Sequence, residues 1–518
     1  MNRAIKFGLY FVISFSVLAF GAAEVWAVSI IQFVVFLLFI VMVVLYNGRI
    51  HRFSVHFFQQ GVPSLFFTRE SVIWIPVALF TLLILFQLIP LPGGVLKVLS
   101  PATYNLYLET GIWDQGVGFE HQWRTISINT HKTFRMLLKL LAYMGIFMII
   151  FYYHNSNNKK NRVSNLSSQS GNEHNRKNNS PREYKGTAIV LPNQFIVSLV
   201  WTIFFLGVFN TFFFFLQQTS MGHIQWLLPL APPGIHLGTF KSPNNFSEFL
   251  EMAVPLAMSL LIAQHYHDMK RMPLINGSRV IWISALFSRS GLISFGIIVM
   301  VSALLLSLSK GGLVTFSITM IAVLLFMFMS YRLRNKQVFA LFVFVLAGSF
   351  CYLVWLGVGP IIKESRYFFM ALGPQGRIVV YRDAINIIAD FPLFGIGFGC
   401  WKDIILKYHS MIGREIWMPR IAYNDTLQLA AETGLAGLSC IIAFLFIIYR
   451  KAIIALKHGT DVFVQALILG GLAAMTAALI HSQFDYLFIL PSNALAFSAI
   501  AGMTYRLSCE ILVKAVTP

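Results

Sequence analysis

Apolar runs of about 18 or more residues recur along the whole chain, and each is long enough to cross a bilayer as a helix. The runs are continuous and do not alternate with polar residues, which argues against a transmembrane β-barrel. Because helices satisfy their own backbone hydrogen bonds in lipid, the pattern predicts an all-α, polytopic transmembrane helical bundle of about 12 spans. The expected spans cover residues 5–22, 25–46, 72–92, 132–152, 191–215, 246–264, 287–307, 312–331, 337–359, 425–449, 462–482 and 491–508.

Composition supports a membrane protein. The 518 residues are 57% hydrophobic and 11% charged, whereas a soluble domain would carry roughly 25% charged residues. The formal net charge is +19, but Lys and Arg gather in the cytoplasmic loops of membrane proteins, so we expect no nucleic acid partner. The four cysteines have neither CxxC nor metal-ligand spacing, and no disulfide framework is indicated.

The charge distribution orients the predicted bundle. An even number of spans puts both termini on one side, and Lys and Arg are concentrated in the loops of the side that holds the N-terminus. By the positive-inside rule, both termini are therefore cytoplasmic. Arg3 and Lys6 precede an apolar stretch that resembles a signal peptide, but no convincing cleavage pattern follows, so we expect a retained first helix.

Three regions are expected along the chain. Residues 1–152 hold the first helices and a first external loop, and residues 153–190 form a cytoplasmic linker whose Asn, Ser and Lys content predicts disorder. Residues 191–518 form the main transmembrane core, which includes a long external loop at 360–424. That loop mixes aromatic residues with Arg, Gly and Pro, so we expect it to be ordered and to carry function.

The long loop contains the first candidate motif. Arg377 and Tyr381 are four residues apart and share a helix face, Arg382 follows, and Pro392 ends the helix. The planar fork of Arg suits a phosphate, so these residues fit a lipid-linked pyrophosphate, although solvated charge or contact with lipid head groups explains them equally well. The GIGFG sequence at 395–399 is interpreted as a tight, closely packed turn, because no strand precedes it.

A polar stripe begins the span that follows this loop. Asn424 or Asp425 can cap the helix, and Asn424, Gln428 and Glu432 then recur every four residues. Glu432 would lie roughly 12 Å inside the helix. An ionisable group at that depth is a functional candidate, and structural pairing with a buried Arg is the alternative.

Three shorter segments add candidates. Asn244 lies in a turn that enters a span, with simple capping as the alternative, and Lys310 lies in a tight turn at a helix end, where a Lys ordinarily snorkels to the interface. His481 and Asp485 are four residues apart near the outer membrane edge, a pair that is more often structural than catalytic. No metal-ligand cluster is recognisable, so neither a metal nor a cofactor is expected.

In this order, the segments resemble the O-antigen ligase/polymerase family. The resemblance covers most of the chain, and each motif is weak while the ordered set is fairly specific. The residues that carry it are Gly238, Thr239, Phe240, Ser242, Pro243 and Asn244; Ser309, Lys310, Gly311 and Gly312; Arg377, Tyr381, Pro392, Gly395 and Gly397; and Tyr423, Asn424, Leu427, Gln428, Glu432 and Gly434. Residues 123–133 also resemble the first external loop of that family.

The resemblance implies a metal-independent glycosyltransferase of the bacterial inner membrane, which acts in cell-surface polysaccharide or lipopolysaccharide biosynthesis. It would move a glycan from undecaprenyl pyrophosphate to a lipid A-core, glycan or protein acceptor on the periplasmic face, next to membrane lipid. Pyrophosphate would be bound by Arg377, Arg382 and Lys310, and catalysis would involve Arg377, Tyr423 and Glu432. Further substrate contacts are expected from Asn244, Asn424, Gln428, His481 and Asp485.

Two positions depart from the family pattern. Lys310 stands where the family usually has Arg, which keeps the charge but loses the bidentate grip. Tyr423 replaces a His that is thought to activate the acceptor hydroxyl, and Tyr is a poor general base near neutral pH. Glu432, His409 or His481 could take that role, the reaction could proceed without a strong base, or activity could be lost.

Several functions share these motifs. A polysaccharide polymerase and a protein O-glycosylating transferase differ from a ligase only in the acceptor, which the sequence does not reveal. A lipid-linked glycan transporter should show repeat symmetry and charges along a path through the bilayer. Here the polar groups gather on one face, which favours an enzyme over a transporter or a non-catalytic assembly protein.

Overall fold

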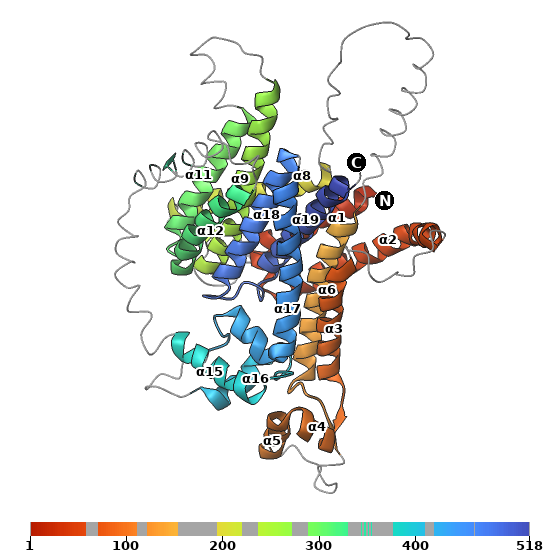
Figure 1. Ribbon diagram of the computed structural model, residues 1–518. Helices are drawn as coiled ribbons and strands as arrows, with labels where there is room; N and C mark the ends of the chain where they lie inside the picture. The colour runs from red at the N-terminus through yellow and green to blue at the C-terminus, as the bar shows by residue number, and fades with distance from the viewer. Residues whose placement is uncertain are drawn as a thin grey trace.

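The computed structural model describes most of the chain, and Figure 1 shows a helical bundle with smaller helices at one end. The described residues are 2–58, 71–110, 122–153, 194–219, 237–271, 288–329, 377–409, 419–459 and 461–516, with isolated positions 343, 347, 348, 351 and 354. The linker predicted at 153–190 lies outside this part of the chain except for its first residue.

Long helices occupy the predicted spans. They are α1 (Asn2–Leu18), α2 (Val25–Phe58), α3 (Trp74–Leu88), α6 (Thr130–Tyr152), α8 (Gln194–Thr219), α9 (Pro243–Arg271), α11 (Arg289–Leu306), α12 (Lys310–Met329), α17 (Asp425–His458), α18 (Val462–His481) and α19 (Pro491–Val516). Within the described residues, 8 helices are long and apolar enough to cross a membrane, and α3 is a shorter apolar helix. The all-α, polytopic class is therefore confirmed. The total of about 12 spans stays a prediction, because the span expected at 337–359 lies almost wholly outside the described residues.

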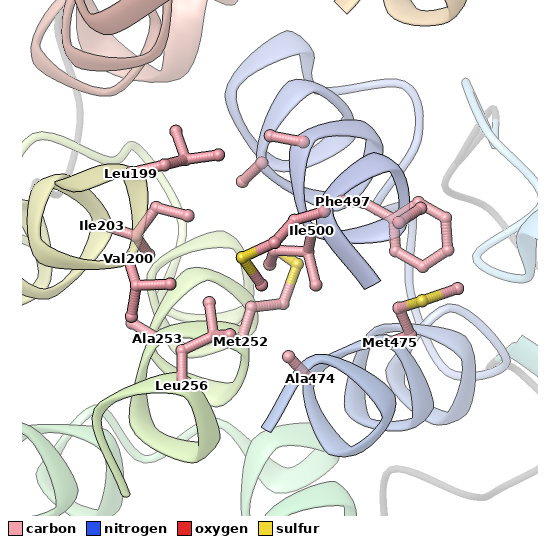
Figure 2. Packing of buried hydrophobic residues seen from close by; sticks show 14 of the residues in the cluster. Leu199, Val200, Ile203, Met252, Ala253, Leu256, Ala474, Met475, Phe497 and Ile500 are labelled. Atoms are coloured by element: carbon pink, nitrogen blue, oxygen red, sulfur yellow. The ribbon is translucent and has the colours of Figure 1, made fainter. Parts of the chain in front are cut away.

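Helix α9 forms the centre of the bundle, and every residue from Asn245 to Ala263 is buried. Figure 2 shows apolar side chains of α8, α18 and α19 that converge on it. Small residues let the backbones approach, as expected where lipid removes the hydrophobic drive between helices. A Cβ on Gly470 of α18 would lie only 2.4 Å from the side chain of Ser259 in α9.

The shorter elements lie at the end of the bundle where α17 begins (Figure 1). Strands β1 (Leu91–Pro92) and β2 (Trp123–Arg124) pair antiparallel, next to α4 (Gly93–Leu99) and α5 (Pro101–Glu109). The described part of the long predicted loop forms α15 (Arg377–Asp390) and α16 (Trp401–Tyr408), so the expected order is confirmed there. Short 3₁₀ turns precede α2 and α3, at η1 (Phe20–Ala22) and η2 (Ser71–Ile73).

The turn between α15 and α16 packs closely against a kink in α17. Gly434 interrupts the helix with φ +67°, and a Cβ there would lie 2.2 Å from the carbonyl oxygen of Leu393. Gly395 has φ +68°, and its Cβ would lie 2.4 Å from the carbonyl carbon of Glu432. The backbone N–H of Gly397 donates to the Glu432 carbonyl at 3.0 Å. The predicted tight, closely packed turn at 395–399 is confirmed, and its partner is the kink of α17.

Replacing Gly434 with Ala should destabilise the protein by more than about 1 kcal/mol, because the added Cβ has no room and φ is positive. Thermal unfolding of the detergent-solubilised protein measures the change. Gly94→Ala is the matched control, because no atom lies within 4 Å of a Cβ at that helical position. Equal unfolding temperatures for the two variants would contradict the close contact at the kink.

Candidate functional site

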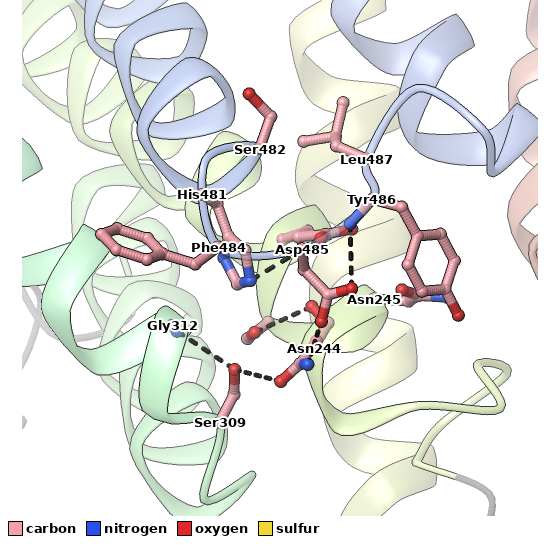
Figure 3. A network of polar contacts seen from close by, with 12 residues as sticks. Asn244, Asn245, Ser309, Gly312, His481, Ser482, Phe484, Asp485, Tyr486 and Leu487 are labelled. Atoms are coloured by element: carbon pink, nitrogen blue, oxygen red, sulfur yellow. Dashed lines mark hydrogen bonds and ion pairs between the residues drawn. The ribbon is translucent and has the colours of Figure 1, made fainter. Parts of the chain in front are cut away.

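The candidate site is centred on the carboxylate of Asp485, in the loop that follows α18 (Figure 3). Its Oδ2 atom accepts a hydrogen bond from the side-chain amide of Asn244 and lies 3.4 Å from Nη2 of Arg377. Its Oδ1 atom accepts from the backbone N–H of Tyr486 at 2.9 Å. The Asp485 side chain is 2% exposed, while that of Arg377 is 40% exposed. The Asp485 carboxylate thus links Asn244 of α9 to Arg377 of α15, and the guanidinium of Arg377 remains partly exposed.

Asn244 connects this carboxylate to the start of α12. The hydroxyl of Ser309 donates to Oδ1 of Asn244 at 2.8 Å and accepts from the backbone N–H of Gly312 at 3.0 Å, which caps the helix. Leu308, just before, has φ +57°, an unusual conformation for a branched residue. Lys310 is the first residue of α12. The motifs around Asn244 and Lys310, which are separate in the sequence, are therefore joined by the hydrogen bond between Ser309 and Asn244.

Arg377 is fixed by three contacts. Besides Asp485, its guanidinium donates to the carbonyl oxygen of Phe484, and its central carbon lies 4.9 Å from the centroid of the Tyr423 ring. Tyr381, one turn later, donates to the carbonyl of Tyr423 at 3.0 Å. The shared face of Arg377 and Tyr381 is thus confirmed, and it faces the segments just before α17 and just after α18.

Arg382 has a different position. It is exposed, and five residues of helix rotate it roughly 140° from Arg377. The structure therefore does not bring the two guanidinium groups to the same face of α15. The role of Arg382 in binding pyrophosphate stays a prediction.

Tyr423 lies in a strained backbone conformation. Its φ is +53°, a region that side chains rarely adopt and that His tolerates more readily than most residues. Burial raises the pKa of the Tyr423 phenol above its usual value near 10. The ring packs edge-on against that of Tyr486 at 6.4 Å, and burial raises the pKa of Tyr486 to about 12. Both phenols are therefore neutral at pH 7, so Tyr423 can donate a hydrogen bond but is not poised to accept a proton.

Asn424 and Asp425, which directly follow Tyr423, attach α17 to the loop that carries Asp485. The side chain of Asn424 caps α17 by accepting from the N–H of Leu427 at 2.9 Å, and it donates to the carbonyl of Gln483 at 3.1 Å. Asp425 accepts from the N–H groups of Leu487 and Phe488 at 2.7 and 3.0 Å. The sequence indicates Asp425 only as an alternative cap, because its partners lie 62 and 63 residues away and give no local signal.

Glu432 belongs to a different cluster. Its Oε2 accepts from the N–H of Gly399 at 2.8 Å, and its Oε1 accepts from the N–H of Trp401 at 3.2 Å and from Nε2 of Gln428 at 3.0 Å. The side chain is 2% exposed. Backbone amides therefore take the place of the buried Arg considered from the sequence. The predicted polar stripe is present, but neither side chain reaches Asp485. Gln428 contacts Glu432 and the N–H of Ala422, and Glu432 holds the turn between α15 and α16. Their catalytic or binding roles stay predictions.

His481 takes partners other than Asp485. Because α18 ends at His481, the two residues do not share a helix, and their side chains are not paired. The Nδ1 atom of His481 instead lies 2.9 Å from Oε2 of Glu251, and its Nε2 lies 3.6 Å from Oε1 of Glu248. Glu248 also accepts from Nδ2 of Asn493 at 2.8 Å. These four side chains form a buried cluster behind the candidate site.

His409, another candidate base, lies 2.7 Å from Oδ2 of Asp383 through its Nδ1 atom. That pair links α15 to the end of α16 and includes no residue of the Asp485 network. Within the described residues, no group of three or more His, Cys, Asp or Glu side chains is arranged to hold a metal ion.

Comparison with known proteins gives one finding. Residues 295–442 match the family model described as O-antigen ligase, and no curated protein matches the chain. The matched segment runs from α11 into α17 and so includes Ser309, Arg377 and Tyr423, while Asn244 and Asp485 lie outside it. The resemblance to the O-antigen ligase family is therefore confirmed over residues 295–442, which form an O-antigen ligase domain.

Proposed function

We propose that the protein transfers a glycan from undecaprenyl pyrophosphate to an acceptor hydroxyl, in the manner of an O-antigen ligase. The observation that carries the proposal is Arg377, a half-open guanidinium held by Asp485, Phe484 and the Tyr423 ring. A fixed fork of this kind suits a phosphate that gains charge as a leaving group. The family domain around it supports a glycan-transferring reaction.

The pyrophosphate of the donor would bind Arg377 by replacing Asp485 as the partner of its guanidinium. Its Nη2 lies 3.4 Å from Asp485, longer than the ~2.8 Å of a strong charge-assisted hydrogen bond. A doubly charged pyrophosphate would compete well for this cation, with help from Lys310 at the start of α12 and from Arg382 farther along α15. The exchange would release Oδ2 of Asp485 from its only cationic contact among the described residues.

Asp485 is then the group best placed to accept a proton. Tyr423 is a neutral phenol at pH 7, and Glu432, His409 and His481 are each held by partners outside the Arg377 network. The acceptor oxygen would form a bond to the anomeric carbon with inversion, while the bond from that carbon to the pyrophosphate oxygen breaks. The hydroxyl proton would pass to Asp485, and the charge of the released undecaprenyl pyrophosphate would be stabilised by Arg377 and Lys310. This scheme uses no metal ion.

The setting follows from the charge distribution. Lys and Arg favour one side, which supports both termini in the cytoplasm and the Arg377 site on the outer face. The family domain supports a bacterial inner membrane, whose outer face is periplasmic. Acceptors of three kinds fit the same chemistry: a lipid A-core, a growing glycan or a protein hydroxyl. A polymerase or a protein O-glycosylating transferase would therefore use the same residues.

Arg377→Ala should reduce transfer on the order of 100-fold or more, because it removes the leaving-group contact. The assay uses proteoliposomes with a lipid-linked oligosaccharide, candidate acceptors and a readout of released undecaprenyl pyrophosphate. Lys407→Ala, at an exposed position of α16, is the control and should transfer normally. Arg382→Ala should have a smaller effect than Arg377→Ala. Addition of one glycan block to the acceptor would indicate a ligase, whereas a ladder of products with increasing numbers of repeats would indicate a polymerase. Wild-type transfer by folded Arg377→Ala protein would refute the proposal.

Asp485→Asn should lower the rate of transfer by roughly 100-fold or more, because an amide of the same shape cannot accept the proton. Donor binding should be retained or become tighter, since the competing carboxylate charge is gone. Rates and donor affinity are measured separately, with Asp390→Asn at the exposed end of α15 as the control. If donor binding and transfer fell together, Asp485 would position Arg377 and would not act as the base.

Substitutions of Tyr423 separate its ring from its hydroxyl. Tyr423→Phe keeps the ring against Arg377 and should retain transfer within about threefold, whereas Tyr423→Ala removes the cation–π contact and should lose more. Because the pKa of Tyr423 is raised above 10, the wild-type rate between pH 6 and about 9 should not follow its ionisation. A pH–rate profile that loses a limb in Tyr423→Phe would show that the hydroxyl acts as the base.

A further inference from the structure

A second group of cations lies on α6 and α16, outside the network of Arg377 and Asp485. Arg135 and Lys139 are one turn apart on α6, and Lys402 lies at the start of α16. Like charges at this helical spacing repel one another. The contacts of the turn before α16 with α6 place Lys402 near this pair.

The packing of α16 on α6 brings these cations together. A Cβ on Gly399 would lie 2.4 Å from Cγ of Met136, so the turn before α16 lies directly on α6. One residue later, Sγ of Cys400 lies 3.5 Å from the hydroxyl of Thr133. Next to Lys402, Asp403 forms an ion pair of 2.7 Å with Lys132. The contacts fix the start of α16 against the first two turns of α6.

Lys139 is the unusual member of the group. It lies roughly 14 Å from the first residue of α6, within a candidate membrane span of 23 residues, and its side chain is half-buried. A cation at that depth is unfavourable unless a partner offsets its charge. Among the described residues, no carboxylate lies within ion-pair distance of Arg135, Lys139 or Lys402. The neighbouring carboxylate, Asp403, is engaged by Lys132.

The surface beside the cations is apolar. Phe134 and Leu141 of α6 are 51% and 38% exposed, on a helix that is long and apolar enough to span a membrane. A lipid whose chains lie along this surface would carry its head group to the level of Arg135 and Lys139. A phosphate is the group in such a lipid that supplies the missing negative charge.

We propose that Arg135, Lys139 and Lys402 bind the phosphate of a lipid head group, at a site separate from Arg377. The site requires only the membrane setting and the three cations, so it stands apart from the proposed transfer reaction. Two lipids supply this chemistry: an ordinary anionic phospholipid, with one phosphate, and the undecaprenyl pyrophosphate carrier, with two.

Native mass spectrometry of the full-length protein in detergent tests the site. Phosphatidylglycerol, undecaprenyl pyrophosphate and zwitterionic phosphatidylcholine are titrated separately against the wild type and against Arg135→Gln, Lys139→Gln, Lys402→Gln and the triple variant. Each single change should weaken binding of the anionic lipid about fivefold, as expected for one cation near a membrane surface. In an Arg377→Ala background, which removes the proposed donor site, the triple variant should bind either anionic lipid no better than phosphatidylcholine.

Three controls make the outcome specific. Lys139→Arg keeps the charge and should bind within about twofold of wild type, and Lys407→Gln neutralises another cation of α16 and should have no effect. Loss of only the pyrophosphate carrier would identify it as the ligand, and loss of both anionic lipids would indicate phosphate recognition in general. Unchanged binding of both by the triple variant would overturn the proposal. Arg377→Ala should leave this binding intact even if it abolishes transfer, so the two proposals fail independently.

Discussion

The close contact between the kink of α17 and the turn at 395–399 is the constraint on which the functional end of the molecule depends. Two glycines with positive φ, Gly395 and Gly434, let the two backbones meet at a distance that no Cβ would allow. Glu432 then binds the N–H groups of Gly399 and Trp401. Because α15 precedes this turn and α16 follows it, one contact sets the positions of both helices against the bundle. Glu432 therefore helps to position Arg377 on α15 and Lys402 on α16, although its carboxylate contacts neither side chain.

Much of the fold follows from local sequence pattern. Apolar length predicted the helices, since each must satisfy its own backbone in lipid. Spacing predicted that Arg377 and Tyr381 share a face and that Asn424 or Asp425 caps α17, because both depend on residues within one turn. The structure gives Asn424 as the cap. The tight turn at 395–399 was also readable, because its glycines permit a backbone conformation that other residues resist.

The partners of the polar side chains were less predictable, because most of them come from distant segments. Spacing suggested that His481 would pair with Asp485, but α18 ends at His481, and Glu251, 230 residues away, lies nearer. Glu432 was singled out for its depth in a helix, yet its partners are backbone amides of a turn that no local pattern connects to it. Depth in the membrane marks such a residue as costly, but it does not reveal which partner offsets the cost.

The buried carboxylates of this end divide into two kinds. Asp425 and Glu432 each accept two or more hydrogen bonds from backbone N–H groups or an amide, so their oxygens are engaged in holding segments together. Asp485 also accepts from the N–H of Tyr486 and the amide of Asn244, but it differs from those two in facing a partly exposed cation, Arg377, at 3.4 Å. That contact can be exchanged when an anion arrives. This difference bears on Tyr423, which stands where the family has His. Its main contributions are a carbonyl that accepts from Tyr381 and a ring face against Arg377. Neither requires an ionisable group, so the loss of His is compatible with transfer if the proton passes to the exchangeable carboxylate.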